Sequence, residues 1–379
     1  MDIAQFDDIR PYNDLELDAA MKRIANNPLF ANISSYLFPK QDINFFKDII
    51  LKCHTVDDFQ NNVMALIVNK ILSDTAKKLT YGGLENFDKD KKYLIISNHR
   101  DIVLDSAIIQ LILHEENVTT SEIAVGDNLI TSPFIEDISR SNKMIKVIRS
   151  SSPREVYTTS QRLSQYIRYN ITSDKSSIWI AQRNGRTKDG ADATEQGLLK
   201  MLEMSGKGDF IKDFSDLNII PVSVSYEYEP CDLLKSVELF ISRRRKYIKS
   251  KDEDLNSILT GIMQFKGNIH IQFNEPLTYE EISSSTKCDT NDKNEKYKSL
   301  AAIIDNKINS NYYLWKNNYI AYDLVNNCDT FANEYSTSDK QSFINYVKYK
   351  ISSSEVDHDE LEDIFLSIYS NPVKSKFKI

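Results

Sequence analysis

Apolar residues near the start of the chain recur at intervals of three and four positions, which is the spacing of one face of an α-helix. This spacing is present from residue 17 to 37 and again from residue 43 to 71. Asp14 and Asp42 stand where helix N-caps are expected. The pattern predicts a helical N-terminal region over residues 1–80, with about three or four helices.

The middle of the chain changes to short apolar segments that are rich in β-branched residues. These predict strands at residues 93–97, 121–125, 144–150, 176–181, 218–226 and 268–273. Segments whose apolar residues have helical spacing lie between several of these strands, at residues 104–113, 156–171 and 194–205. Alternation of strands and helices is typical of an α/β fold. We therefore expect a mixed, largely parallel central sheet with flanking helices over residues 81–282.

The positions of glycine and of polar residues indicate where the chain forms loops. All ten glycines lie between Gly82 and Gly267. Because glycine permits tight turns, we expect the loops that carry the chemistry in this part of the chain. Residues 283–296 are polar and predict a solvated linker or loop. A tyrosine-rich helical C-terminal extension is predicted beyond it, over residues 297–379.

Composition narrows the class of protein. Of the 379 residues, 41% are hydrophobic and 27% are charged. This is ordinary for a globular protein of about two or three folding units, and it excludes collagen-like, disordered and disulfide-scaffold classes. The net charge of −8 argues against a general nucleic-acid binder, which is normally basic, so we expect no nucleic-acid partner.

Cysteine use and the length of apolar segments bear on the compartment. Cys53, Cys231, Cys288 and Cys328 are far apart and form no CxxC pair, which fits a reducing compartment and indicates no metal site. The first ten residues are acidic where a secretory signal would be basic and then apolar. No window approaches the length of about 18 apolar residues that spans a bilayer. We expect a cytoplasmic protein, at most a peripheral one.

His99 has the most suggestive context among the five histidines. It directly follows a predicted strand and precedes a helical pattern, and Asp101 and Asp105 lie close behind it. Ligands of α/β sheets bind at the carboxyl ends of the strands. A nearby carboxylate can fix the tautomer of a histidine and stabilise its imidazolium, as a general base requires. Alternatively, Asp105 only caps the helix and His99 is a surface turn residue.

The segment NHRDIVLD, residues 98–105, resembles the NHxxxxD signature of the glycerolipid acyltransferase superfamily, of the lysophosphatidic acid and glycerol-3-phosphate acyltransferase type. AQRNGRTKDG, residues 181–190, resembles its phosphate-binding block, usually written FPEGTRSRDG. Three further blocks follow the family's order, at residues 126–150, which end in a strand with Arg149, at residues 218–230 with Pro221, and at residues 267–277. The resemblance covers roughly residues 80–280.

Two positions depart from the family pattern. Five residues separate His99 from Asp105 where the family has four, and Leu104 fills the usual aspartate position. We assign the family's aspartate role to Asp105, with Asp101 as the fallback partner of the histidine. The phosphate block is one residue short, and Asn184 replaces its glutamate, whereas Arg186 still matches the family's arginine.

The resemblance implies an acyltransferase that moves a fatty acyl group from acyl-CoA or acyl-carrier protein to the hydroxyl of a glycerol-phosphate or lyso-lipid acceptor. His99 would be the general base oriented by Asp105, with no cofactor. Backbone N–H groups in the turn after His99 or at Gly185 would stabilise the oxyanion. Arg186 is the first choice to bind a phosphate. The expected substrate-binding residues are Asn98, Arg100, Arg149, Asn184, Gly185, Arg186 and Lys188.

The departures leave two alternatives open. The acceptor could be a lyso-aminolipid without phosphate, or the chain could be a lipid- or acyl-carrier-binding protein that has lost catalysis. Residues 241–251 carry six cations beside Tyr247 and Ile248. The run is compatible with solvated charge, or with docking on anionic lipid headgroups. With the resemblance, it predicts a membrane surface as a partner and a peripheral location on the inner face of a bacterial membrane.

Overall fold

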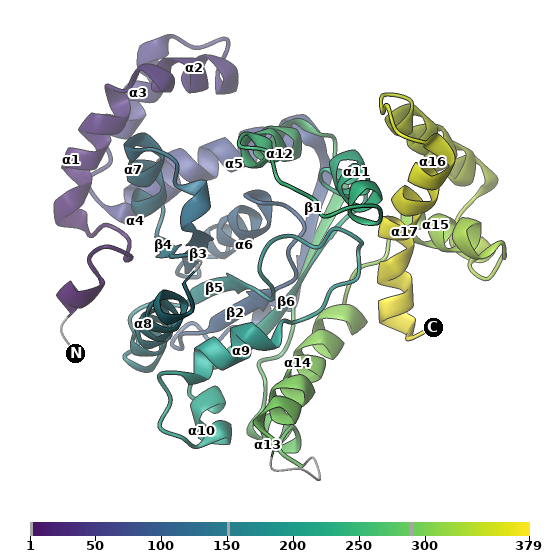
Figure 1. Ribbon diagram of the computed structural model, residues 1–379. Helices are drawn as coiled ribbons and strands as arrows, with labels where there is room; N and C mark the ends of the chain where they lie inside the picture. The colour runs from purple at the N-terminus through teal and green to yellow at the C-terminus, as the bar shows by residue number, and fades with distance from the viewer. Residues whose placement is uncertain (1–2, 150–151, 288–291) are drawn as a thin grey trace.

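The computed structural model describes residues 3–149, 152–287 and 292–379. Its centre is a seven-stranded sheet with the order β1-β7-β6-β2-β5-β3-β4 (Figure 1). The strands are β1 (Ala76–Gly82), β2 (Leu94–Ser97), β3 (Glu122–Gly126), β4 (Met144–Val147), β5 (Ile178–Ala181), β6 (Ile219–Tyr226) and β7 (Gly267–Phe273). In the described part of the chain, β6 and β7 pair antiparallel, and the other neighbours pair parallel. The predicted α/β fold is confirmed.

Helices cover both faces of the sheet, because its central strands are apolar on both sides. In β2, Leu94 and Ile96 pack into one core and Ile95 into the core on the opposite face, as the alternation of side chains along a strand requires. The first core includes α8 (Pro153–Thr172), α9 (Gln196–Glu203), α10 (Phe210–Ser215) and α14 (Lys293–Ser310). The second includes α5 (Ala65–Thr75) and α6 (Leu104–Glu115).

The N-terminal helices pack around a third apolar core. They are α1 (Asp14–Ala25), α2 (Pro28–Leu37), α3 (Ile43–Leu51), α4 (Val56–Phe59) and a π-helical turn (Gln60–Met64) that leads into α5. The 3₁₀ turn that precedes them (Ile3–Phe6) instead places Phe6 in the first core. Phe134 of α7 (Pro133–Ser141) completes the third core. Asp42 caps α3 as predicted, whereas the cap of α1 is Asn13 and Asp14 is the first residue of that helix.

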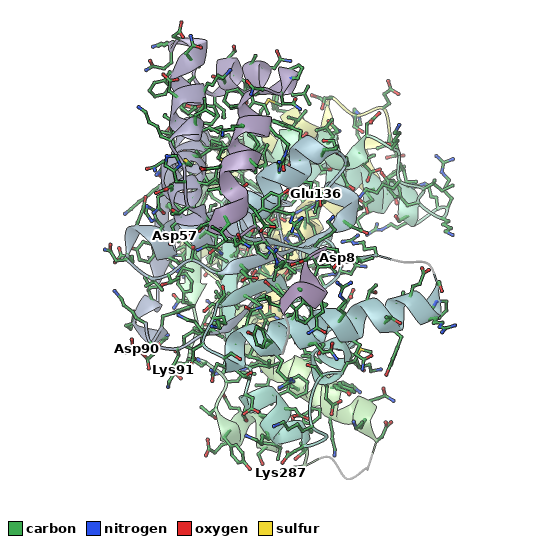
Figure 2. All side chains as sticks on the ribbon, turned by 90° about the vertical axis from the view of Figure 1, so that its left-hand side faces the viewer. Asp8, Asp57, Asp90, Lys91, Glu136 and Lys287 are labelled. Atoms are coloured by element: carbon green, nitrogen blue, oxygen red, sulfur yellow. The ribbon has the colours of Figure 1, made fainter. Side chains whose placement is uncertain are left out.

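Ion pairs fasten the N-terminal region to the α/β part. Figure 2 looks onto this side and labels Asp8 and Asp57. The carboxylate of Asp8 pairs with Arg162 of α8, and that of Asp57 pairs with Lys143, which directly precedes β4. The helical N-terminal region is therefore attached along one flank of the sheet.

The prediction of helix is wrong for residues 76–80, which begin β1. Lys77 and Lys78 are exposed, so this strand lacks the apolar run that marks the central strands. Its conformation is fixed by parallel pairing with β7, for example between Tyr81 and Ile271. A local sequence pattern cannot show a pairing between segments so far apart in the chain.

The C-terminal part is helical, as predicted. It contains α13 (Tyr279–Ser284), α14, α15 (Lys316–Asn326), a 3₁₀ turn (Ala332–Glu334), α16 (Thr337–Ile351) and α17 (His358–Phe377). The polar loop predicted at 283–296 is shorter, because α13 and α14 include its ends; residues 288–291, with Cys288, lie outside the described residues. The domain boundaries at 80, 282 and 297 stay a prediction.

The described residues contain neither a membrane-spanning helix nor a cluster of metal ligands. None of their helices is both long enough and apolar enough to cross a bilayer. No group of three or more histidine, cysteine, aspartate or glutamate side chains in the same residues could hold a metal ion. Cys53, Cys231 and Cys328 are free thiols.

Candidate active site

The turn between β2 and α6 lies at the edge where the parallel strands β2 and β5 both end. His99 follows β2 by two residues, and residues 181–190 follow β5. The two loops touch directly, because the N–H of Thr187 donates a hydrogen bond of 2.8 Å to the carbonyl oxygen of His99. The histidine motif and the phosphate-type block therefore meet in one place.

His99 and Asp105 form a hydrogen-bonded pair. Nδ1 of His99 lies 2.9 Å from Oδ2 of Asp105. The Asp105 side chain is 0% exposed, whereas the histidine side chain remains 13% exposed. The ring of Trp179 packs edge-on against the imidazole, with 5.8 Å between ring centroids. The imidazole is thus held on two sides and still reaches the surface.

Asp105 is surrounded by hydrogen-bond donors. Its Oδ2 accepts the backbone N–H groups of Arg100 at 2.6 Å and Asp101 at 2.9 Å. Its Oδ1 accepts the hydroxyl of Tyr226 at 2.8 Å. Burial, together with the charge of Asp105, raises the pKa of Tyr226 well above its ordinary value, so this hydroxyl remains a donor. The turn therefore folds around the carboxylate.

Asp101 has a different position from Asp105. Its Oδ1 accepts the N–H groups of Val103 and Leu104, both at 2.8 Å, and so it caps the start of α6. Its Oδ2 is buried without a partner among the described residues, close to Gly261. Burial, aided by the neighbouring Asp105, raises the pKa of Asp101. Of the two carboxylates considered, Asp105 is the one that contacts His99.

Asn98 is fully buried beneath the turn and joins two strands. Its side-chain carbonyl accepts the N–H of Val224 at 2.7 Å. Its amide donates to the carbonyl oxygen of Val224 and to Asp192. Its hydrogen-bonding groups are directed at protein atoms, which gives it a positioning role in this structure.

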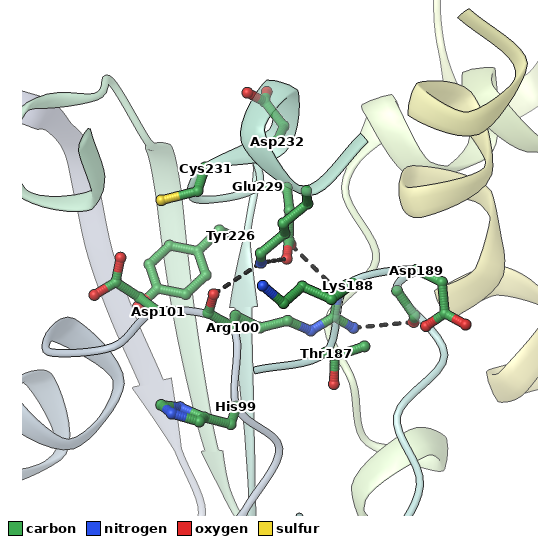
Figure 3. A network of polar contacts seen from close by, with 12 residues as sticks. His99, Arg100, Asp101, Thr187, Lys188, Asp189, Tyr226, Glu229, Cys231 and Asp232 are labelled. Atoms are coloured by element: carbon green, nitrogen blue, oxygen red, sulfur yellow. Dashed lines mark hydrogen bonds and ion pairs between the residues drawn. The ribbon is translucent and has the colours of Figure 1, made fainter. Parts of the chain in front are cut away.

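Arg100 is also fully buried, in an ionic network on the far side of the turn (Figure 3). Its guanidinium pairs with Asp192 and Glu229 and lies over the ring of Tyr312, 5.2 Å from the centroid. Lys235 donates to the carbonyl oxygen of Arg100 at 2.8 Å and to Glu229 at 2.6 Å. A buried charge is stable only when it is paired in this way. The network fixes the backbone next to His99.

The loop after β5 places Arg186 in a groove. The Arg186 side chain is mostly buried beside Cys231, and its Nη1 is itself enclosed, with no acceptor among the described residues. The groove has a volume of about 560 Å³, and Arg186 shares it with Lys188 and Lys235. Lys188 pairs with Glu238, and burial lowers the pKa of Lys188. Of these three cations, Arg186 is the one without a carboxylate partner among the described residues, because Lys235 pairs with Glu229.

The other predicted contact residues lie nearer the surface. Asn184 is exposed, and its N–H donates to Glu195 at 3.2 Å. Gly185 is exposed with φ of +77°, a left-handed conformation that favours glycine, in open space. Arg149 is exposed, and its guanidinium lies against Gly126. Among the described residues, neither Arg149 nor Asn184 lines the groove of Arg186.

Residues 78–225 match the family model described as Acyltransferase. This part of the chain is similar to the acyltransferase family. The match runs from β1 to the end of β6 and includes His99, Asp105 and Arg186. The resemblance predicted from the sequence blocks is thereby confirmed at the level of the acyltransferase family.

Comparison with solved structures finds the 1-acyl-sn-glycerophosphate (LPA) acyltransferase PlsC from Thermotoga maritima. It is 12% identical to this chain, with 77% of this chain and 92% of that chain covered, and a TM-score of 0.39. The likeness is too distant to bear on function. A search among curated proteins finds no match.

Two side chains of the candidate site were not predicted from the sequence. Tyr226 reaches Asp105 from the end of β6, and Trp179 packs on His99 from β5. Trp179 also donates to the hydroxyl of Ser97 at 3.0 Å, which fixes its indole under the turn. Each lies in an apolar strand next to β2, so only the strand order would have revealed them.

Proposed function

We propose that the protein transfers a fatty acyl group from an acyl thioester, carried on coenzyme A or acyl-carrier protein, to the hydroxyl of a glycerol-phosphate or lyso-lipid acceptor. In this proposal His99 is the general base and Asp105 orients it. The observation that carries the proposal is the contact between a partly exposed imidazole and a fully buried carboxylate. Similarity to the acyltransferase family supplies the class of reaction.

The surroundings of Asp105 indicate which nitrogen of His99 carries the proton. Both carboxylate oxygens accept hydrogen bonds from backbone or tyrosine donors, so Asp105 acts as an acceptor toward the ring as well. Nδ1 of His99 is then the protonated nitrogen, and Nε2 has the free lone pair. No described residue hydrogen-bonds to Nε2. The basic nitrogen is thus left for a substrate.

The reaction then proceeds in two steps. Nε2 of His99 takes the proton of the acceptor hydroxyl while its oxygen attacks the thioester carbon and forms a tetrahedral intermediate. The intermediate collapses, the carbon–sulfur bond breaks, and the thiolate takes the proton back from Nε2. The products are an ester and a free thiol. Such proton transfer contributes about 10²–10⁴-fold to the rate.

The oxyanion of the intermediate needs hydrogen-bond donors that the fold has not already used. In the turn after His99, the N–H groups of Arg100 and Asp101 bind Asp105, and those of Val103 and Leu104 bind Asp101. Among the described residues, the N–H group of Ile102 in this turn has no acceptor, and Gly185 is the second source expected from the sequence. It stands exposed in the loop that touches the carbonyl of His99.

Arg186 is the proposed site for the phosphate of the acceptor. A guanidinium that has no carboxylate partner can bind a phosphate oxygen through a charge-assisted hydrogen bond. This favours a phosphorylated acceptor over a lyso-aminolipid without phosphate. The assembled His99–Asp105 pair likewise disfavours a protein that only binds lipid, because binding alone does not require an oriented base.

Purified protein incubated with acyl thioesters and lysophosphatidic acid tests the proposal, with phosphatidic acid measured by mass spectrometry. We expect His99→Ala to lower turnover by at least about 10³-fold. The matched control is His54→Ala, because His54 also pairs with an aspartate through Nδ1, far from the groove. Equal turnover in His99→Ala and wild type would remove His99 as the base.

A further inference from the structure

Helix α12 (Glu253–Met263) has an inner face that packs against the active-site turn. The carbonyl oxygen of Ser257 accepts a hydrogen bond from the thiol of Cys231 at 3.2 Å. A Cβ atom on Gly261 would lie 2.1 Å from Oδ2 of Asp101, so only glycine fits there. Asn256 and Ser257 also line the groove that contains Arg186. The helix is thus a wall of the proposed site.

The outer face of α12 exposes a row of large apolar side chains. Leu255, Leu259 and Met263 recur every four residues, and this spacing places them on one side of the helix. Together with Phe265, which follows the helix, they are 45–57% exposed. We call these four residues the apolar stripe. Contiguous exposed apolar surface of this kind marks an interaction site.

A cationic segment, residues 243–251, lies at the N-terminal end of the apolar stripe. The hydroxyl of Tyr247 donates to Glu253 at 2.6 Å, and Lys249 pairs with Asp254. These two contacts fold the segment onto the first turn of α12. Ile248, between them, is exposed.

Half of the six cations of the cationic segment have no carboxylate partner among the described residues. Glu360 pairs with Arg244 and, at 3.9 Å, with Arg243. Within the described residues, Arg245, Lys246 and Lys251 have no carboxylate at ion-pair distance. At the other end of the apolar stripe, Lys77 lies 5.9 Å from the ring centroid of Phe265. Cations therefore flank the apolar side chains at both ends.

We propose that the apolar stripe and the cationic segment dock the protein on an anionic lipid surface. Apolar side chains would enter the boundary between headgroups and acyl chains, and the cations would bind anionic headgroups. Figure 1 shows α12 at the outer edge of the molecule, beside α5 and α11 (Asp232–Ser242). Because the inner face of α12 lines the groove, docking would hold the groove next to the membrane. This inference goes beyond the proposed function.

Vesicle sedimentation with the full chain and no substrate tests the docking surface. We expect binding to phosphatidylcholine vesicles that contain one-third phosphatidylglycerol, and weak binding to phosphatidylcholine alone. The variant Arg245→Gln/Lys246→Gln/Lys251→Gln should weaken binding to anionic vesicles about a hundredfold, since each cation near the surface contributes about 1 kcal/mol. Leu255→Ser/Leu259→Ser should weaken it about tenfold or more.

Leu29→Ser is the matched control, because Leu29 is an equally exposed leucine on α2. It should bind as wild type does, and circular dichroism should show that all variants are folded. No binding to anionic vesicles, equal binding to neutral ones, or unchanged binding by Leu255→Ser/Leu259→Ser would overturn the proposal. Since no acyl transfer is measured, these outcomes are independent of the chemistry proposed for His99.

Discussion

Two histidine–aspartate pairs of nearly equal geometry lie in different regions of this molecule. In the turn after β2, Nδ1 of His99 is 2.9 Å from Asp105, and among the N-terminal helices Nδ1 of His54 is 2.8 Å from Asp18. Their burial differs sharply. The side chains are 13% and 0% exposed in the first pair, against 69% and 60% in the second.

The comparison shows that the contact distance alone does not make an oriented base. Asp105 is fixed by two backbone N–H groups and a tyrosine hydroxyl, whereas the side chain of Asp18 hydrogen-bonds to His54 alone among the described residues. An exposed ion pair contributes about 0–1 kcal/mol, because water competes for both partners. Preorganised donors around a buried carboxylate hold the imidazole in one orientation before substrate arrives.

The largest effect is expected from Asp105→Asn. The amide cannot accept from all the donors around it, so it would turn its NH₂ toward the ring or toward the turn and misorient His99. We expect kcat/KM to fall about 10³-fold and the free energy of unfolding to fall by about 2–4 kcal/mol. Steady-state kinetics and denaturant titration measure the two quantities.

Asp18→Asn is the control for this substitution and should leave both quantities within error, because the pair with His54 is exposed. Near-wild-type kcat/KM in Asp105→Asn would show that orientation by Asp105 contributes little. If Asp18→Asn lowers kcat/KM and the free energy of unfolding as much as Asp105→Asn does, the difference in burial between the two pairs has no effect on either quantity.

Arg186 and Lys188, two cations that line the groove, also differ in their surroundings. Lys188 is paired with Glu238, whereas Nη1 of Arg186 has no acceptor among the described residues. We expect Arg186→Met to raise KM for lysophosphatidic acid about 10–100-fold, from the loss of a charge-assisted hydrogen bond. Lys188→Met should raise it by less than about threefold.

Acceptors with and without phosphate provide the control for Arg186. KM for a monoacylglycerol should be the same in Arg186→Met and wild type, because that acceptor offers no anion. If KM rises equally for both acceptors, Arg186 shapes the groove rather than binding phosphate. Partial recovery in Arg186→Lys would indicate that charge, more than the planar guanidinium, carries the effect.

The central strands could be predicted because their signal is local. Runs of β-branched apolar residues mark β2, β5 and β6, which are buried on both faces of the sheet. β1 has exposed Lys77 and Lys78 and is specified by its distant partner β7, so its own sequence did not reveal it. Local sequence patterns thus predict the strands that are buried on both faces of the sheet. They do not predict β1, whose conformation depends on pairing with β7.

The same reason explains which parts of the site were predicted. His99 and Asp105 share one turn, and the extra residue between them is accommodated because the N–H groups of Arg100 and Asp101 close on the carboxylate. Tyr226 is 121 positions from Asp105 and reaches it because β6 lies beside β2. The strand order, which brings such residues together, was not predictable from the spacing of motifs.

Tyr226→Phe tests the contribution of this distant donor to the buried pair. Removing the hydroxyl leaves Oδ1 of Asp105 without its donor. We expect kcat to fall about tenfold and the free energy of unfolding to fall by about 1–2 kcal/mol. The control is Tyr81→Phe, since Tyr81 also donates to a carboxylate, Glu116, but at an exposed site. If both substitutions are silent, the orientation of Asp105 depends on the backbone donors alone.

Glu122 shows what burial does to a carboxyl group that lacks such a ring of donors. It accepts the hydroxyl of Tyr166 at 2.8 Å, and burial raises the pKa of Glu122 to about 7. Between pH 4.5 and about 7 the folded state keeps a proton that the unfolded state has lost, so stability falls as pH rises through this window.

Glu122→Gln keeps an acceptor for Tyr166 and removes the titration. We expect the free energy of unfolding of Glu122→Gln to equal that of wild type near pH 4.5 and to be about 1–2 kcal/mol higher at pH 8. The whole change of the pKa of Glu122 from 4.5 to about 7 sets an upper limit of about 3 kcal/mol. Urea titrations at the two pH values measure this difference. If the difference in stability between Glu122→Gln and wild type is the same at both pH values, the folded protein does not disfavour the ionised form of Glu122.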